Sequence, residues 1–324
     1  MAHMIEYRDG KASMAWTGQV PWHGLGKEVP ADLTPAQMLK AADLDWTVEK
    51  IPAYATVAGK QVAVGRSALV RSVDNAVLDT VSEDWNPVQN QDAFDFFNEF
   101  VMAGDMEMHT AGSLRGGQIV WGLAKVKDSF ELFKGDRIDS YLLFSNFHRY
   151  GSSTDVRFTP IRVVCNNTLS LSLNAAVERM VRISHRREFN AENVKSMLGI
   201  ATDKLSKYKE MAQFLGSKRA TKEQTLDYFR TIFPSGKEAE EKAEANGEVK
   251  VSKKAAIALE IMHTQPGAEY APGSFWQLFN TVTFMADHML GKSQDSRLVN
   301  SWYGYNRKMK TQALETAVEM ANAA

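Results

Sequence analysis

The spacing of apolar residues changes near residue 188, and this change constrains the fold more than any other feature of the chain. From about Trp46 to Val181, short runs rich in β-branched residues are separated by Gly, Asn and Asp, a pattern that predicts strands. After Glu188, apolar residues recur at helical spacing in a polar background. We therefore expect an α+β fold, with a β-rich N-terminal part built on an antiparallel sheet and an α-helical C-terminal part.

Helix-start residues and changes in composition indicate where the helices and the domain boundary lie. Two helices should interrupt the β-rich part, one opening at Thr34 and the other covering 90–104. We expect two domains: a β-rich α+β core over 1–187 and a helical region over 188–324, with a charged loop near 235–250. Within the helical region, helices are expected over 190–215, 221–233, 252–265, 274–291 and 307–323.

Composition limits the classes of function. A net charge of -1 argues against a polybasic protein, so any contact with nucleic acid must be confined to a local groove. The single cysteine, Cys165, excludes a disulfide framework and a thiolate zinc cluster, and the histidines and acids lack metal-binding spacing. We therefore expect no metal and no cofactor. Without a signal-peptide-like start or a long apolar run, the chain is expected to be cytoplasmic, with no membrane partner.

Arginine is concentrated between Tyr141 and Glu188, where seven Arg and no Lys stand against three acidic residues, a local charge of +4. A planar guanidinium binds phosphate through two hydrogen bonds and stacks on flat rings, so we expect a phosphate-rich partner. A solvated surface is the alternative interpretation of such a charge run. The candidate nucleic-acid-binding residues are His148, Arg149, Tyr150, Arg157, Arg162, Arg179, Arg182, Arg186 and Arg187, together with Arg115 at a glycine-rich hairpin turn.

Three other features have both a functional and a structural interpretation. Cys165 could be a nucleophile beside a histidine, but its place at the end of an apolar strand favours burial. His23 could be a ligand or a base, although a turn histidine packed on Trp22 is favoured. The cluster 166–168, Asn-Asn-Thr, either caps a helical turn or contacts a base or ribose, and both interpretations stay open.

Several motifs follow one another along the chain: PWHGLG, LDWTVEKIPAY, NPVQNQDAFDFF, TAGSLRGGQIVWGLAKV, SNFHRYGS and TPIRVVCNNTLS. With these motifs and its helical tail, the chain resembles the phage/plasmid-like domain-of-unknown-function family, which is encoded on bacteriophages, plasmids and other mobile elements. The resemblance implies a mobile-element origin and a bacterial cytoplasm, but no established activity. Many relatives have His-Asp-Gly-Ser at one turn, where this chain has His148-Arg149-Tyr150-Gly151-Ser152.

These observations favour a non-catalytic protein that binds single-stranded DNA in phage or plasmid recombination and replication, similar in architecture to single-strand annealing proteins. Such a protein is expected to be a homo-oligomer, with subunit contacts from the Phe- and Met-bearing C-terminal helices. Two alternatives remain. One is an enzyme acting on nucleotides or nucleic acid, with His148 as general base and Arg149 or Arg162 stabilising charge. The other is a protein-interaction factor, such as a host-defence antagonist, whose arginines meet an acidic partner.

Overall fold

The computed structural model describes residues 5–18, 24–127, 130–162, 167–168, 181–185, 202–236, 249–291 and 300–324. For residues 130, 158–162, 167–168, 181–183 and 202–207 it describes the backbone only. Contacts divide the chain into two compact units. Unit 1 comprises Met1–Asp128, Ser140–Phe158 and Arg179–Ile200, and unit 2 comprises Ser129–Asp139, Thr159–Glu178 and Ala201–Ala324. Unit 2 therefore takes its residues from both sides of residue 187.

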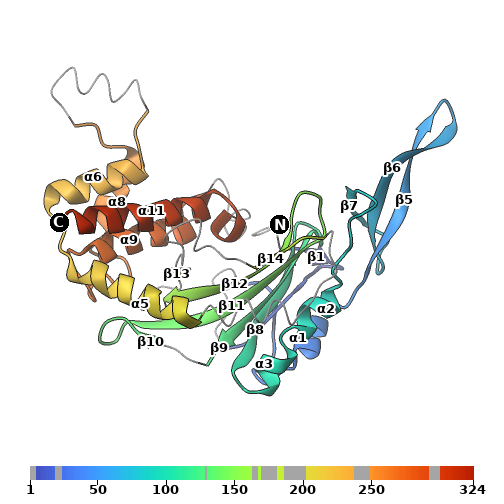
Figure 1. Ribbon diagram of the computed structural model, residues 1–324, viewed down its shortest axis with the longest axis horizontal. Coiled ribbons are helices and arrows are strands. Elements are labelled where there is room, and N and C mark those ends of the chain that lie inside the picture. The colour runs from blue at the N-terminus through green and yellow to red at the C-terminus, as the bar shows by residue number, and fades with distance from the viewer. Residues whose placement is uncertain are drawn as a thin grey trace. The chain divides into compact units, whose positions relative to one another are not determined.

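The order of elements confirms the predicted fold class, a β-rich part with antiparallel sheets and helices followed by an α-helical part (Figure 1). The strands are β1 (Tyr7–Arg8), β2 (Lys11–Ala12), β3 (Met14–Trp16), β4 (Lys27–Glu28), β5 (Val48–Val57), β6 (Lys60–Arg71), β7 (Val77–Val81), β8 (Met106–Leu114), β9 (Ile119–Val126), β10 (Phe130–Glu131), β11 (Arg137–Phe147), β12 (Thr154–Arg162), β13 (Asn167–Thr168) and β14 (Val181–Ile183). The helices are α1 (Pro35–Ala41), α2 (Asn90–Asp95), α3 (Asn98–Met102), α5 (Thr202–Ser217), α6 (Lys222–Ile232), α8 (Lys253–Ile261), α9 (Phe275–Phe284), the π-helical turn η2 (Met285–Met289) and α11 (Tyr305–Asn322).

The larger sheet has the strand order β13-β12-β11-β9-β8-β3-β4 among the described residues, with β10 beside β11 and β14 beside β12. In the described part of the chain, β3 and β4 pair in parallel, whereas β10 with β11, β11 with β9, β12 with β13 and β14, β3 with β8 and β8 with β9 pair antiparallel. β8 and β9 form a hairpin whose turn begins at Arg115 and contains Gly116 and Gly117, all at positive φ. This confirms the hairpin interpretation of the glycine-rich segment.

Helices α2 and α3 and the two residues between them contribute aromatic side chains to the core of unit 1. The predicted helix over 90–104 is split, because the backbone tightens between Phe94 and Phe97, where the Phe97 N–H donates to the Phe94 carbonyl at 2.9 Å. Phe96 and Phe97, on either side of this tighter turn, both reach the core. Gly122 of β9 leaves room for these rings, since a Cβ there would lie 3.2 Å from both Phe94 and Phe97.

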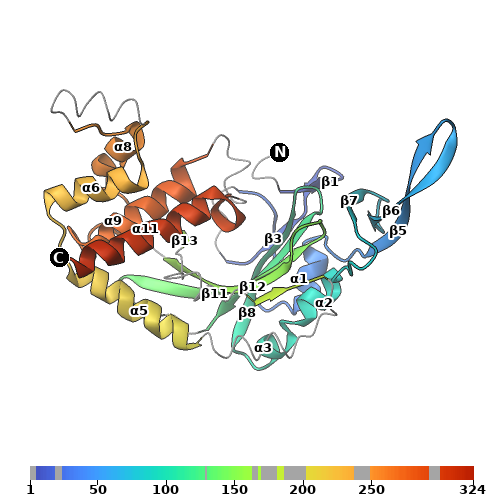
Figure 2. The same ribbon diagram turned by 45° about the horizontal axis from the view of Figure 1, so that its top comes forward.

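A second sheet of unit 1 contains β5, β6 and β7. The hairpin of β5 and β6 is much longer than β7, which pairs only with Ser67–Val70 of β6. In Figures 1 and 2 the far end of this hairpin, in blue, projects away from α1, α2 and β8. We call residues 51–65 the arm. Every residue from 54 to 65 is exposed.

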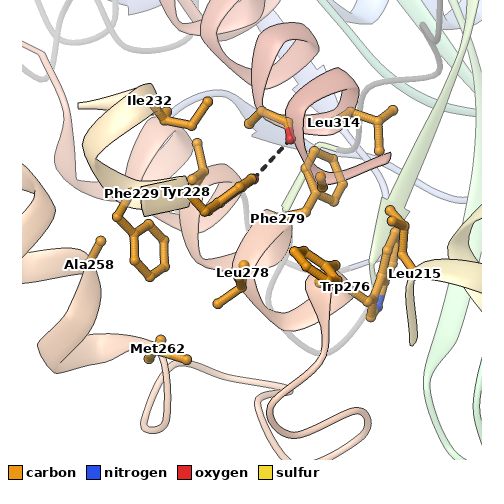
Figure 3. Packing of buried hydrophobic residues seen from close by; sticks show 14 of the residues in the cluster. Leu215, Tyr228, Phe229, Ile232, Ala258, Met262, Trp276, Leu278, Phe279 and Leu314 are labelled. Carbon is orange, nitrogen blue, oxygen red and sulfur yellow. Dashed lines mark hydrogen bonds between the residues drawn. The ribbon is translucent and has the colours of Figure 1, made fainter. Parts of the chain in front are cut away.

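The helices of unit 2 pack around α9, which is buried along nearly its whole length. Trp276, Phe279, Tyr228 and Phe229 lie at the centre, and the Tyr228 hydroxyl donates to the Ala313 carbonyl of α11 at 3.0 Å (Figure 3). Capping boxes begin two of the helices: Thr34 with Gln37 at the start of α1, and Thr221 with Gln224 at the start of α6. Since most of the apolar side chains of α9 fill this core, they are not available for the subunit contacts that the sequence predicted.

Candidate nucleic-acid interface

Tyr150 projects from the turn between β11 and β12 and is 53% exposed. Its backbone N–H donates to Asp79 Oδ2 of β7 at 2.8 Å, which fixes the turn against the smaller sheet. The guanidinium of Arg66 lies over the Tyr150 ring, 4.8 Å from its centroid, and donates to the Thr80 carbonyl at 2.6 Å. An anchored guanidinium therefore holds the ring in place while the ring remains accessible.

The β8–β9 turn lies beside the turn that carries Tyr150. The His148 N–H donates to the Gln118 carbonyl at 2.9 Å, and the Gln118 side chain donates to the Leu78 carbonyl at 2.7 Å. These bonds bring Arg115 close to Arg149. The pKa of Arg115 is lowered, first by burial and then by the positive charge of Arg149.

The structure thus gathers Arg66, Arg115, Arg149 and Tyr150 from three separate segments; we call these four residues the turn cluster. Asp79 is the acid bonded to it, through the Tyr150 backbone. In the described part of the chain, neither Arg115 nor Arg149 forms an ion pair. Arg115 also has a φ of 54°, a left-handed conformation that is unfavourable for a residue with a Cβ. The arrangement combines unpaired cations with an exposed flat ring.

His148 lies beneath this surface and is fully buried. Its Nε2 is 2.9 Å from Asn90 Oδ1, while the Asn90 amide donates to the carbonyls of Leu44 and Trp46 at 3.0 and 3.3 Å. Because the Asn90 amide nitrogen is engaged elsewhere, Oδ1 is the acceptor, and the imidazole proton is assigned to Nε2. Asn146 extends the buried network by donating to the Val88 carbonyl at 2.8 Å.

Burial is the main cause, together with the charges of His185 and Arg71, that lowers the pKa of His148 from its ordinary value of 6.5 to about 3. A fully buried imidazole with such a pKa is a weak base and has no access to a ligand at the surface. This geometry does not suit the general-base role considered from the sequence, nor direct contact with nucleic acid. His148 instead joins β11 to the start of α2 and so positions the turn that follows it.

Two other buried basic side chains of unit 1, His185 and Arg71, have partners within the unit. His185 stacks on Trp85 with ring centroids 4.1 Å apart, and its Nδ1 lies 3.0 Å from the Asn86 carbonyl. The buried Arg71 forms ion pairs with Glu6 and with Asp74, and its guanidinium lies 5.2 Å from the Trp46 ring centroid. Arg71 is therefore neutralised, and it is not a candidate for ligand contact.

A comparison with known protein families identifies the family of this chain. Residues 77–318, about three quarters of the chain, match the family described as Domain of unknown function (DUF932). The chain belongs to this family. No curated protein and no solved structure matches it.

The DUF932 match begins at β7, so it includes Arg115, Arg149 and Tyr150, but it starts after Arg66 and the arm. Arg66 was missed by the sequence reasoning because it lies far outside the arginine-rich stretch, and only the folded chain places it on Tyr150. Among the described residues of this DUF932 protein, no helix has the length and apolar character needed to cross a membrane.

The other predicted arginines are not gathered at the turn cluster. Arg157 has a side chain only 13% exposed, with its Nε 3.8 Å from Asp155 Oδ1, so it is largely covered and paired. Arg162 and Arg182 lie in β12 and β14, where the backbone alone is described; Arg182 is opposite Asp155. The remaining predicted sites, Arg179, Arg186 and Arg187, lie outside the described residues.

The other candidates of this DUF932 chain lie partly outside the described residues too. His23, Cys165 and Asn166 are among those not described, as is most of the charged loop near 235–250. Asn167 and Thr168 form strand β13, where they pair with Arg162 and Ile161. Their backbone is therefore used in a strand ladder.

Proposed function

We propose that this chain is a nucleic-acid-binding protein that binds single-stranded DNA in the recombination or replication of a phage, plasmid or other mobile element, in the bacterial cytoplasm. The turn cluster is the observation that carries the proposal. It brings together the guanidinium groups of two neighbouring turns, that of Arg66 from strand β6, and an exposed tyrosine ring, with Asp79 as the acid bonded to the cluster. Guanidinium groups bind the phosphates and the ring stacks on a base.

The exposed ring favours a single strand over a duplex. In a duplex the bases are stacked on one another, so a surface tyrosine meets only the backbone, whereas an unpaired base can stack on it. Tyr150 is 53% exposed, and Arg66 holds its ring from one side. A base stacked on such a ring contributes about 1–3 kcal/mol of binding free energy.

Fluorescence anisotropy with a labelled oligothymidine, at several salt concentrations, tests the proposal. Binding should weaken linearly in a plot of log affinity against log salt. The double variant Arg115→Ala/Arg149→Ala should bind more weakly and reduce the salt slope by about 1.4, since each phosphate contact contributes about 0.7 for a single strand. Tyr150→Ala should weaken binding by roughly tenfold or more while leaving the slope unchanged.

A matched control is available on α8, where Lys253 and Lys254 are exposed at the start of the helix. Lys253→Ala/Lys254→Ala removes the same charge from unit 2 and should bind like the wild type. Absence of salt-sensitive binding at low ionic strength would refute the proposal. An equal loss in the control and in the arginine variant would show that binding responds to total charge and not to the turn cluster.

A further inference from the structure

The arm is the most apolar exposed element in the described part of the chain. Tyr54, Val57, Val62 and Val64 are 57%, 58%, 50% and 47% exposed, and Ile51 at the base of the arm is 44% exposed. Single exposed apolar residues are common on protein surfaces, but a contiguous group of them marks an interaction site. A hairpin of two strands is also marginally stable in water by itself.

Strand register sorts these residues onto two faces. Ala55 lies opposite Val62 and Val57 opposite Lys60, so these side chains share one face with Val64, two residues along from Val62. We call Ala55, Val57, Val62 and Val64 the apolar face of the arm. The other face is mixed and carries Tyr54, Thr56, Gln61 and Ala63.

Charge excludes nucleic acid as the occupant of the arm. Between Ile51 and Gly65 the only charged side chain is that of Lys60. One cation at the tip neither binds a phosphate backbone nor recognises an acidic protein. The arm is therefore suited to an apolar partner that also offers a strand.

The edges of the arm decide how that partner docks. β7 covers β6 only along Ser67–Val70, so in the described structure Lys60–Arg66 has a strand on one side only. An uncovered edge is a template for another strand. The outer edge of β5 is less suitable, because Pro52 lacks the N–H that a ladder requires.

We infer that the arm pairs with the arm of a second copy of this chain, β6 against β6 in antiparallel orientation about a two-fold axis at Val62. In this register Val62 faces Val62 of the second copy, and Val64 faces Lys60, so no like charges meet. The two apolar faces join into one continuous surface. Because each arm projects away from its own α1, α2 and β8, the pairing occurs at the tips of the arms (Figures 1 and 2).

Sedimentation velocity over a range of protein concentrations, without nucleic acid, tests this inference independently of the proposed function. The wild type should associate as concentration rises. Val62→Asp places like charges opposite each other at the axis and should raise the dissociation constant by roughly tenfold or more, since like charges that meet across an interface cost several kcal/mol. Thr56→Asp adds the same charge to the mixed face of β5 and should leave association unchanged. A protein that stays monomeric at every concentration overturns the inference, as does an equal effect of the two variants.

Cross-linking tests the register directly. The chain has one cysteine, so Cys165→Ser provides a background without thiols. In that background, Val62→Cys should form a disulfide-linked dimer under mild oxidation, because cross-strand Cβ atoms at the axis lie about 4.5–5.5 Å apart. Thr56→Cys is at an exposed position too but should remain largely unlinked. Equal cross-linking of the two variants would overturn the proposed pairing.

Discussion

The buried imidazole of His148 makes the stability of unit 1 depend on pH, and the effect can be worked out from the structure. The pKa of His148 is about 3 in the folded chain, against the ordinary value of 6.5, because the side chain is fully buried. Between these two values only the unfolded chain binds the proton. Protonation therefore stabilises the unfolded state, and the free energy of unfolding falls as pH is lowered from about 6.5 towards 3.

For pKa values of 6.5 and about 3, the loss between pH 7 and pH 5 is about 2 kcal/mol. The pKa of His185 is also lowered by burial and shifts stability in the same direction. His148→Gln removes the titrating group while keeping an amide that can donate to Asn90. Its free energy of unfolding should depend less on pH, by about 2 kcal/mol over this interval.

Urea unfolding of both proteins at pH 7 and pH 5, followed by tryptophan fluorescence and circular dichroism, measures this difference. His263→Gln, at an exposed position after α8, is the matched control and should keep the wild-type dependence. Identical pH dependence in the wild type and His148→Gln would refute the reasoning. Imidazole ¹⁵N spectra add a direct check, since a proton on Nε2 and a neutral ring at pH 5 are expected.

Two predictions concern the core of unit 2, measured by urea unfolding. Tyr228→Phe removes the hydroxyl that donates to the Ala313 carbonyl and should lower the free energy of unfolding by about 1 kcal/mol; no loss would mean that water replaces the bond. Lys310→Met breaks the buried pair with Asp287, whose atoms are 2.8 Å apart, and should cost about 3–5 kcal/mol. The double variant Asp287→Leu/Lys310→Met should recover most of that loss, and a double variant no better than the single one would contradict the pairing.

Sequence patterns predicted the features that depend on neighbouring residues. The helix expected over 221–233 begins where Thr221 and Gln224 cap it within one turn of chain, and the change from strand to helix periodicity is visible within windows of a few turns. The split between α2 and α3 was not predicted. It depends on two adjacent phenyl rings meeting a core whose other side is supplied by Phe144 of β11.

The candidate site was predicted only in part, because it too depends on contacts between distant segments. Arg115, Arg149 and Tyr150 were named from composition and turn chemistry, but their proximity depends on contacts between segments far apart in the chain. Arg66 lies in a strand with no local signal for ligand binding. His148 stands two residues before Tyr150, yet its side chain is buried and hydrogen-bonded to Asn90, which lies 58 residues earlier in the chain. Charge counting cannot separate a paired arginine such as Arg157 from a free one.

The alternation of the two units along the chain has a consequence for synthesis. β14 pairs with β12, and the backbone of Asn86 is bonded to that of His185, so unit 1 is incomplete until residue 185 has been made. By then a ribosome has already produced Ser129–Asp139 and Thr159–Glu178, which belong to unit 2, but none of helices α5 to α11. Those two segments must wait for their partners, so neither unit can be finished as a simple N-terminal fragment during translation.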